Sequence, residues 1–301
     1  MLGSGLIGRA AGAADGGLTM ARAVAGDVVA SLGGGAPDDW LDARDPEYIR
    51  RSLPAIRAWS DLYFRADVSG LDEIPRDEPV LLVGNHSGGT LIADTFVFAQ
   101  HFYDHFGPAR EFHQLAHDLV FKVPGLRASL SRFGTVPASP DNMRSALDRG
   151  AALLVYPGGD HETYRPTWEQ DTIDFAGRTG FVKLALELGT PIVPVVAIGG
   201  QETALFLGRG GRFSRALGLD RALRLKVFPV QIAPPLGITL LDLPLRVPLP
   251  SKITIRVLPR IDLREELGEG ADPDAAYELV TSRMQAVLSE LADERTLPVI
   301  G

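Results

Sequence analysis

The stretch that decides the fold is "PVLLVGNHSGGTLIADTFVF", residues 79–98. A short apolar run of strand type leads into a glycine-rich loop, and a run of helix type follows. Similar strand-type and helix-type runs alternate through the rest of the chain. Alternation at these lengths predicts an α/β fold, with a mixed, largely parallel sheet covered by helices on both faces.

The remaining elements follow from the same patterns. Beyond residues 79–84, strands are expected at 111–116, 134–138, 152–157, 191–198, 225–232 and 253–259. Helices are expected at 18–32, 46–64, 91–106, 141–150, 177–189 and 272–291. The breaker "GGGAPDD" separates the first two helices from each other. We therefore divide the chain into an N-terminal helical segment, residues 1–64, and an α/β domain, residues 65–301, which includes the amphipathic closing helix.

Composition excludes several classes of function. The chain of 301 residues contains no cysteine, so it can form no disulfide, thiolate metal site or cysteine nucleophile. Its net charge of −8 argues against nucleic-acid binding, because a phosphate backbone demands a basic surface. The first residues lack the succession of basic residues, apolar block and cleavage site that is typical of a signal peptide. We therefore expect a cytoplasmic protein.

The loop after the first strand of the α/β domain carries a candidate catalytic histidine. His86 stands where open α/β sheets bind ligands, outside the carboxyl end of a strand. We expect Thr90 to cap the next helix, which places Asp94 in its first turn and lets it return toward His86. An aspartate that accepts a hydrogen bond from one imidazole nitrogen fixes the tautomer and leaves the other nitrogen to accept a proton. The alternative is that Asp94 only complements the helix dipole and His86 only caps a turn.

A second loop, "VYPGGDHETYRP" at residues 155–166, follows another expected strand. Its Pro-Gly-Gly sequence exposes backbone N–H groups, while Glu162 and Arg165 supply a carboxylate and a fork of donors. An ordinary turn with solvated charges is the alternative. Two such loops at the ends of neighbouring strands favour a shared site.

Two histidine pairs suggest a metal site less strongly. His113 and His117 are four residues apart, and so are His101 and His105. The chain has no HExxH sequence, and structural histidines at this spacing are common. We therefore expect no metal site.

Four blocks in this order resemble the glycerolipid and lysophospholipid acyltransferase superfamily. They are "GNHSGG", "FGTVPASPDN", "VYPGGDHE" and "GTPIVPVVAIGGQE", at residues 84–89, 133–142, 155–162 and 189–202. The resemblance covers residues 63–263. It is strongest to the bacterial branch that is related to monoacylglycerol and diacylglycerol acyltransferases.

The resemblance implies an O-acyltransferase similar to 1-acylglycerol-3-phosphate acyltransferases. His86 would deprotonate a lipid hydroxyl and Asp94 would orient it, while the loop around Ser87 and Gly88 would stabilise the oxyanion. The donor would be acyl-CoA or acyl carrier protein, with no further cofactor, and the acceptor a lysophospholipid or a partial glyceride. The expected substrate-binding residues are Asn85, Ser87, Gly88, Gly89, Pro157, Gly158, Gly159, Glu162 and Arg165. A lipid ester or thioester hydrolase and an inactive lipid-binding protein are the alternatives.

The chain also departs from the superfamily pattern. Seven residues separate His86 from Asp94, whereas four is the commonest spacing. The second block lacks the arginine of phosphate-acceptor members, and Gly158 stands where their third block has a glutamate. These departures argue against a lysophosphatidate acceptor, unless its phosphate binds Lys122, Arg144 or Arg165.

A basic segment predicts attachment to a membrane. Residues 209–226 contain six cations and one aspartate, with leucines between them, and an apolar, proline-rich stretch to residue 241 follows. Cations beside apolar residues suit an anionic lipid surface. We expect peripheral attachment to the inner face of the plasma membrane through Arg209–Lys226 and this stretch. The alternative is an exposed basic helix followed by a buried strand.

Overall fold

The computed structural model describes residue 37 and residues 39–122, 124–210, 229–235, 237–239, 242, 246–297 and 299–301. The α-helices in this part of the chain are α2 Pro46–Ala58, α3 Ala93–Phe106, α4 Pro124–Arg132, α5 Pro140–Asp148, α6 Gly159–Thr163, α7 Gly180–Leu188, α10 Leu263–Leu267 and α11 Pro273–Glu294. The strands are β1 Asp67–Ser69, β2 Val80–Gly84, β3 Phe112–Ala116, β4 Thr135–Pro137, β5 Ala152–Val155, β6 Ile192–Ile198, β7 Leu205–Gly208, β8 Val230–Ala233, β9 Gly237–Thr239 and β10 Thr254–Val257. Short 3-10 or π turns lie at η1 Trp59–Tyr63, η2 Leu71–Glu73, η3 Gly89–Leu91, η4 Asp118–Lys122, η5 Thr167–Glu169 and η6 Gly200–Thr203.

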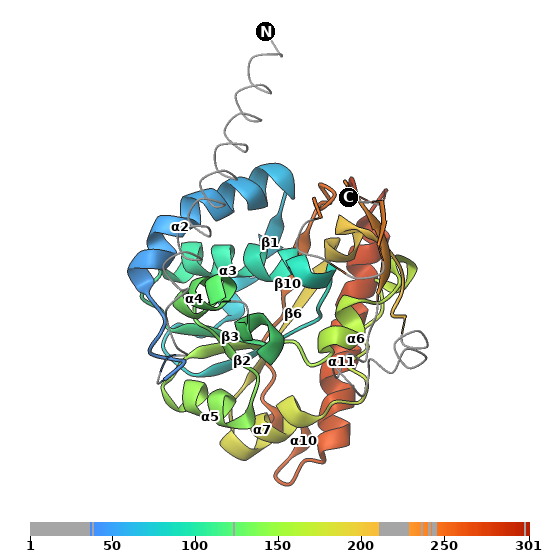
Figure 1. The fold of residues 1–301 in the computed structure, drawn as a ribbon. Coiled ribbons are helices and arrows are strands. Elements are labelled where there is room, and N and C mark those ends of the chain that lie inside the picture. Colours follow the sequence, from blue (N-terminus) through green and yellow to red (C-terminus); the bar gives the residue numbers. More distant parts are fainter. Residues whose placement is uncertain are drawn as a thin grey trace.

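A seven-stranded sheet forms the centre of the molecule (Figure 1). Its strand order is β1-β10-β6-β2-β5-β3-β4. The strands from β6 to β4 run parallel to one another, whereas β10 is antiparallel to β6. The expected mixed, largely parallel sheet is therefore confirmed.

Helices cover both faces of this sheet, as its sequence pattern requires. All five residues of β2 are buried, because alternate side chains enter two different cores. Val80 and Leu82 pack in the core that α2 and α3 share. Leu81 and Val83 pack in the core of α5, α7 and α11. The described part of the N-terminal segment thus belongs to the same packed body as the sheet.

The local start of α2 follows from its sequence. Asp45 caps the helix by accepting hydrogen bonds from the backbone N–H groups of Glu47 and Tyr48. Pro46 occupies the first helical position, where its fixed φ fits and its missing N–H costs nothing. The expected helix at 46–64 is confirmed, ending in the turn η1, whereas the helix expected at 18–32 lies outside the described residues.

A second, smaller sheet departs from the prediction. The strand expected at 225–232 is described only as β8, and it pairs with β7 and β9 in an antiparallel sheet of order β7-β8-β9. The apolar stretch thus contributes to a small sheet instead of to the central one. The sequence did not predict β1, β7 or β9, which have only three or four residues each.

The predicted membrane segment lies mainly outside the described residues. Residues 211–228 are not described, so the helical form of Arg209–Lys226 stays a prediction, as does the location at the inner face of the plasma membrane. No helix in the described ranges has both the length and the apolar character that crossing a bilayer requires.

The parallel strands bring the two candidate loops together. β2 pairs with β5 on one side and with β6 on the other, all three in the same direction. Their carboxyl ends therefore meet at one edge of the sheet. The last residues of these strands, Gly84, Val155 and Ile198, belong to the first, third and fourth sequence blocks.

Candidate active site

His86 and Asp94 meet at this edge as the sequence predicts. His86 Nδ1 lies 3.4 Å from Asp94 Oδ2, a long contact, and only 1% of the aspartate side chain is exposed. The backbone N–H and the hydroxyl of Ser87 donate to the same oxygen, at 2.9 and 3.0 Å. Thr95 N donates to the other carboxylate oxygen at 2.7 Å. The carboxylate is therefore fixed in position beside the imidazole.

The extra residues between His86 and Asp94 form a compact detour. They make the 3-10 turn η3, followed by Ile92 with φ 38° and ψ 47°. A β-branched residue in this left-handed conformation is strained, and surrounding contacts must hold it. Ile92, not Thr90, is the N-cap residue of α3, so the predicted cap is wrong. Asp94 nevertheless lies in the first turn of α3, as predicted.

Tyr156 packs against the histidine ring. The two rings are stacked with centroids 4.2 Å apart and planes 15° apart. Burial, together with the charge of Asp94, raises the pKa of Tyr156 well above its ordinary value, so this phenol stays neutral. Within the described part of the chain, no residue bonds His86 Nε2. The histidine thus faces Asp94 with Nδ1, while its Nε2 has no hydrogen-bond partner among the described residues.

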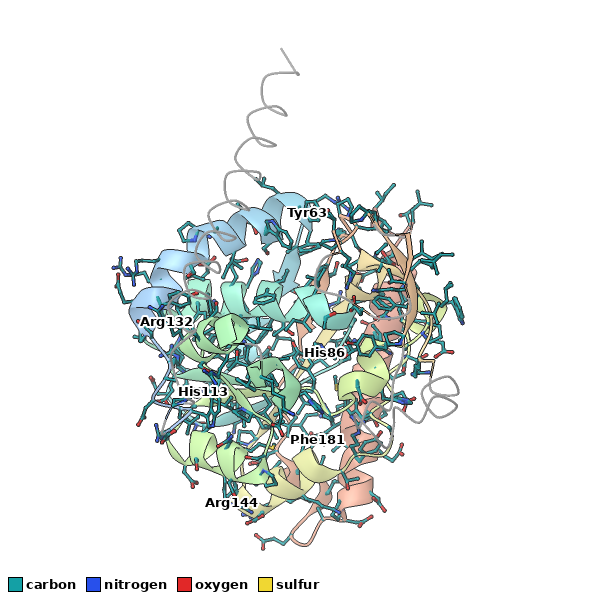
Figure 2. All side chains as sticks on the ribbon, in the orientation of Figure 1. Tyr63, His86, His113, Arg132, Arg144 and Phe181 are labelled. Carbon is teal, nitrogen blue, oxygen red and sulfur yellow. The ribbon has the colours of Figure 1, made fainter. Side chains whose placement is uncertain are left out.

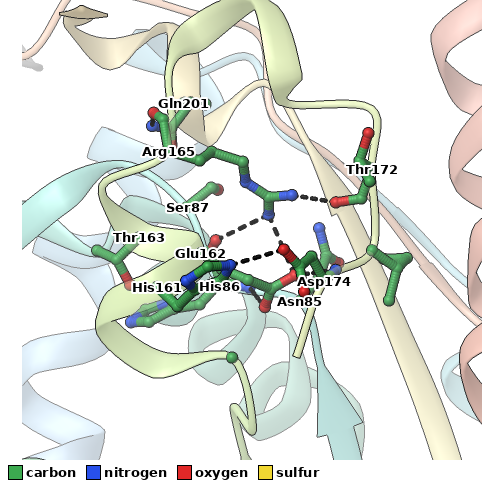
Figure 3. A network of polar contacts seen from close by, with 12 residues as sticks. Asn85, His86, Ser87, His161, Glu162, Thr163, Arg165, Thr172, Asp174 and Gln201 are labelled. Atoms are coloured by element: carbon green, nitrogen blue, oxygen red, sulfur yellow. Dashed lines mark hydrogen bonds and ion pairs between the residues drawn. The ribbon is translucent and has the colours of Figure 1, made fainter. Parts of the chain in front are cut away.

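A buried ion pair from the loop region at residues 155–166, Glu162 and Arg165, holds the backbone of His86 (Figure 3). Glu162 Oε2 accepts from His86 N at 3.1 Å. Arg165 Nη2 donates to His86 O at 3.2 Å and to Glu162 Oε1 at 3.3 Å. Arg165 Nη1 donates to the carbonyl of Thr172. Both side chains of the pair are buried and bonded within the chain, which differs from the expectation that they contact substrate.

Burial also changes the acidity of Glu162. Removal from water raises the pKa of this carboxyl from its ordinary value of 4.5 to about 7. Arg165 and the N–H groups of His86 and Asp174 oppose this rise by favouring the charged form. The charge of the Glu162–Arg165 pair therefore changes near neutral pH.

A second buried ion pair, Asp242 and Arg246, holds the other end of the loop. Arg246 Nε donates to Asp242 Oδ1 at 2.8 Å, and the two side chains are only 2% and 1% exposed. Arg246 Nη2 also donates to the carbonyl of Gly88, and Asp242 Oδ2 accepts from the backbone N–H of Thr90. The sequence analysis missed both residues. The available signal was a pair of opposite charges four positions apart in a proline-rich, apolar stretch.

The expected binding residues of the first block serve the loop itself. The Asn85 side chain donates to Ala197 O and accepts from Ala197 N, each at 2.8 Å, which ties the loop to β6. Gly88 N donates to Gln201 Oε1 at 3.0 Å, and Ser87 N is already bonded to Asp94. Gly89 is buried as well. The predicted oxyanion donors at Ser87 and Gly88 are therefore occupied in this structure.

The Pro-Gly-Gly loop has internal partners too. Arg178 Nη1 donates to Pro157 O at 3.0 Å and to Gly158 O at 2.8 Å. Gly159 N donates to Tyr156 O at 3.1 Å. A Cβ atom at Gly158 would overlap the Glu162 side chain, so glycine is required there by close packing.

The cations that were expected as possible phosphate ligands lie elsewhere or are bonded. Arg165 is committed to Glu162 and to backbone carbonyls, as described above. Arg144 on α5 pairs with Glu187 at 2.8 Å, and Figure 2 shows it well away from His86. Lys122 is exposed in η4. Of these three cations, Arg165 alone contacts His86, through the backbone carbonyl, and its guanidinium is buried in the pair with Glu162.

One histidine of each pair has partners within the chain that are not metal ligands. His113 is buried and bonds Gly134 O at 3.0 Å and Glu111 Oε1 at 3.2 Å. Burial lowers the pKa of His113 below its ordinary value. His101 Nδ1 lies 2.9 Å from Val97 O one helical turn earlier. In the described residues, no three histidine or acidic side chains are grouped to hold a metal ion.

Comparison with known proteins agrees with this picture. Residues 65–198 match the family model described as Acyltransferase. An uncharacterized protein of Mycobacterium tuberculosis is 29% identical over 239 residues, 79% of this chain and 64% of the relative. The chain thus spans less than two thirds of that relative's length. Human diacylglycerol O-acyltransferase 2 is 33% identical over 85 residues, 27% of this chain and 22% of the relative.

A solved structure shares the fold. It is the 1-acyl-sn-glycerophosphate acyltransferase PlsC from Thermotoga maritima, which superposes with a TM-score of 0.52 at 18% identity. The match covers 84% of this chain and 86% of the other.

Proposed function

Since this chain is a member of the glycerolipid acyltransferase superfamily, we propose that it transfers a fatty acyl group from a thioester to the hydroxyl of a lipid. The observation that carries this proposal is the position of His86. Its Nδ1 faces a fixed, buried carboxylate, and its Nε2 has no partner among the described residues. This is the arrangement that a general base requires.

The chemistry follows from that geometry. His86 Nε2 takes the proton of the acceptor hydroxyl as its oxygen attacks the thioester carbonyl. The C–O bond forms, the C–S bond breaks, and the leaving thiolate takes the proton from the imidazolium. Asp94 stabilises the imidazolium and keeps Nδ1 as the protonated nitrogen. We propose direct transfer without an acyl-enzyme, and the absence of cysteine from the chain is consistent with this.

The acceptor that we propose is a partial glyceride or another neutral lipid alcohol. A phosphate headgroup needs cations near the base, but Arg165 and Arg246 are both committed to buried carboxylates. Arg144 is paired with Glu187 and distant from His86. A lysophospholipid acceptor is the second candidate, favoured only by the shared fold with a lysophosphatidate acyltransferase.

The experiment incubates the purified 301-residue chain with radiolabelled acyl-CoA, or with acyl carrier protein that carries the same fatty acyl group, and with one acceptor at a time. Monoacylglycerol and diacylglycerol are compared with lysophosphatidate. We expect labelled glyceride to form at a rate above that with lysophosphatidate. Release of free fatty acid that no acceptor alters would indicate a hydrolase, and the absence of both products would leave a lipid-binding protein.

A further inference from the structure

The small sheet has two different faces. In β7 and β8, buried residues alternate with exposed or half-exposed ones. Phe206 and Gln231 point inward and are buried. Leu205, Ile232 and Ile238 are register partners across the three strands, so they form one row on the other side. We call this side the outer face of the small sheet.

The outer face is apolar and open to solvent. Leu205 is 41% exposed and Ile238 is 69% exposed. The apolar residues that belong to it or border it are Leu205, Leu207, Val230, Ile232, Ile238 and Val247. An apolar row of this kind on a folded surface usually marks an interaction site.

The inner face reaches the active site. A Cβ atom at Gly89 would approach the Phe206 ring to 2.9 Å, so this ring lies against the loop between His86 and Asp94. Gln231 Nε2 donates to Asp242 Oδ1 at 2.8 Å, within the ion pair that holds the same loop. The outer face is therefore separated from the His86 loop by a single layer of strands.

We propose that the outer face of the small sheet docks on an anionic lipid bilayer. This rests on the proposed function, because a lipid acceptor must be drawn from a membrane. Charge supports a bilayer over a protein partner: the connection from β7 to β8 carries Arg212, Arg215, Arg221, Arg224 and Lys226 against one aspartate. A basic connection whose two ends are strands of an apolar sheet suits an anionic surface with an apolar interior. Trp168, in the turn η5 beside β7, is 64% exposed and is a residue type enriched at membrane interfaces.

The test measures sedimentation of the full chain with vesicles of equal parts phosphatidylglycerol and phosphatidylcholine. Leu205→Glu and Ile238→Glu place a charge on the outer face. Leu267→Glu on α10 is the matched control, since that leucine is 37% exposed on another part of the molecule. We expect wild type and control to bind alike, and each outer-face variant to bind about tenfold more weakly or worse. Circular dichroism verifies that all variants are folded.

Several outcomes would overturn the proposal. One is that wild type does not bind these vesicles, and another is that the control loses as much as Ile238→Glu. A third is that changing the four arginines of the β7–β8 connection to glutamate abolishes vesicle binding while Ile238→Glu binds normally. The basic connection would then account for attachment without the outer face. If Ile238→Glu turns a dimer into a monomer without weakening vesicle binding, the occupant is a second copy of the chain.

A soluble assay separates this proposal from the proposed function. Transfer to a short-chain, water-soluble glyceride without vesicles should be equal in wild type and Ile238→Glu. Normal vesicle binding by a chain that never transfers an acyl group would refute the enzymatic proposal and leave docking intact. Equal activity of both proteins on vesicle-borne acceptor would refute docking and leave the enzymatic proposal intact.

Discussion

Two buried ion pairs hold the loop between His86 and Asp94, and they come from different regions of the molecule. Glu162 lies in α6 and Arg165 directly after it, and this pair bonds the backbone of His86 itself. The Asp242–Arg246 pair follows the small sheet and bonds Gly88 and Thr90, in the detour before Asp94. The first pair fixes the backbone of His86, and the second fixes the extra residues between His86 and Asp94. A lengthened histidine-to-aspartate spacing is thus compatible with a formed dyad because the detour has its own support.

The largest expected effect comes from removing one member of a pair. Arg165→Met and Arg246→Met each leave a buried acidic group without its counter-charge, so that it must stay charged out of water or take up a proton. Each should lower the free energy of unfolding by about 3–5 kcal/mol in urea denaturation. Arg144→Met is the control, because its pair with Glu187 is exposed and screened by water, so its loss should change the stability least. Equal stability of all three variants would mean that neither pair supports the loop.

The second-largest expected effect is a pH dependence of stability that comes from the Glu162–Arg165 pair. The folded-state pKa of Glu162 is raised to about 7 from 4.5, so the folded chain binds an additional proton between these values. The stability that this group contributes is therefore highest below pH 4.5 and falls as pH rises to 7, by about 3 kcal/mol. In Glu162→Gln this decrease in the free energy of unfolding should be absent. The measurement is urea denaturation of both proteins between pH 4.5 and 8, and curves that stay parallel would contradict the raised pKa.

The smallest effect tests how closely glycine packs against each pair. A Cβ atom at Gly158 would overlap Glu162, and one at Gly89 would overlap Asp242. Alanine at either position should cost about 1–3 kcal/mol, with more at Gly89 because its φ is +64°. Gly180→Ala at the start of α7 is the control, since its Cβ would enter open space. Thermal denaturation ranks the three variants, and a Gly89→Ala protein as stable as the control would indicate that the loop is not tightly held.

The sequence predicted those parts of the fold that local pattern determines. β2 and β6 are buried on both faces, so each appears as a continuous apolar run that is easy to recognise. β1, β7 and β9 are too short to show a period, and pairing with other strands defines them. The run at 225–232 was recognised as a strand, but an apolar pattern does not reveal which sheet a strand joins.

The site was predicted in part for similar reasons. His86 and Asp94 lie close in the chain, and their contact needed only a turn between them. The cap at Thr90 failed because a tertiary contact with Asp242, far away in sequence, holds that residue in a 3-10 turn. Glu162 and Arg165 were recognised as polar residues of the site, but their complete burial depends on packing that no local pattern encodes. Asp242 and Arg246 were missed because their partners are about 150 positions away.

The central claim is that His86 is the base of an acyl transfer and that Asp94 orients it. The most direct measurement compares the single-turnover rate of acyl transfer from acyl-CoA to a water-soluble glyceride in wild type, His86→Ala and Asp94→Asn, with folding verified by circular dichroism. We expect His86→Ala to lose on the order of 10²–10⁴ in rate, with a large loss in Asp94→Asn as well. A folded His86→Ala protein that transfers the acyl group at the wild-type rate would contradict the account.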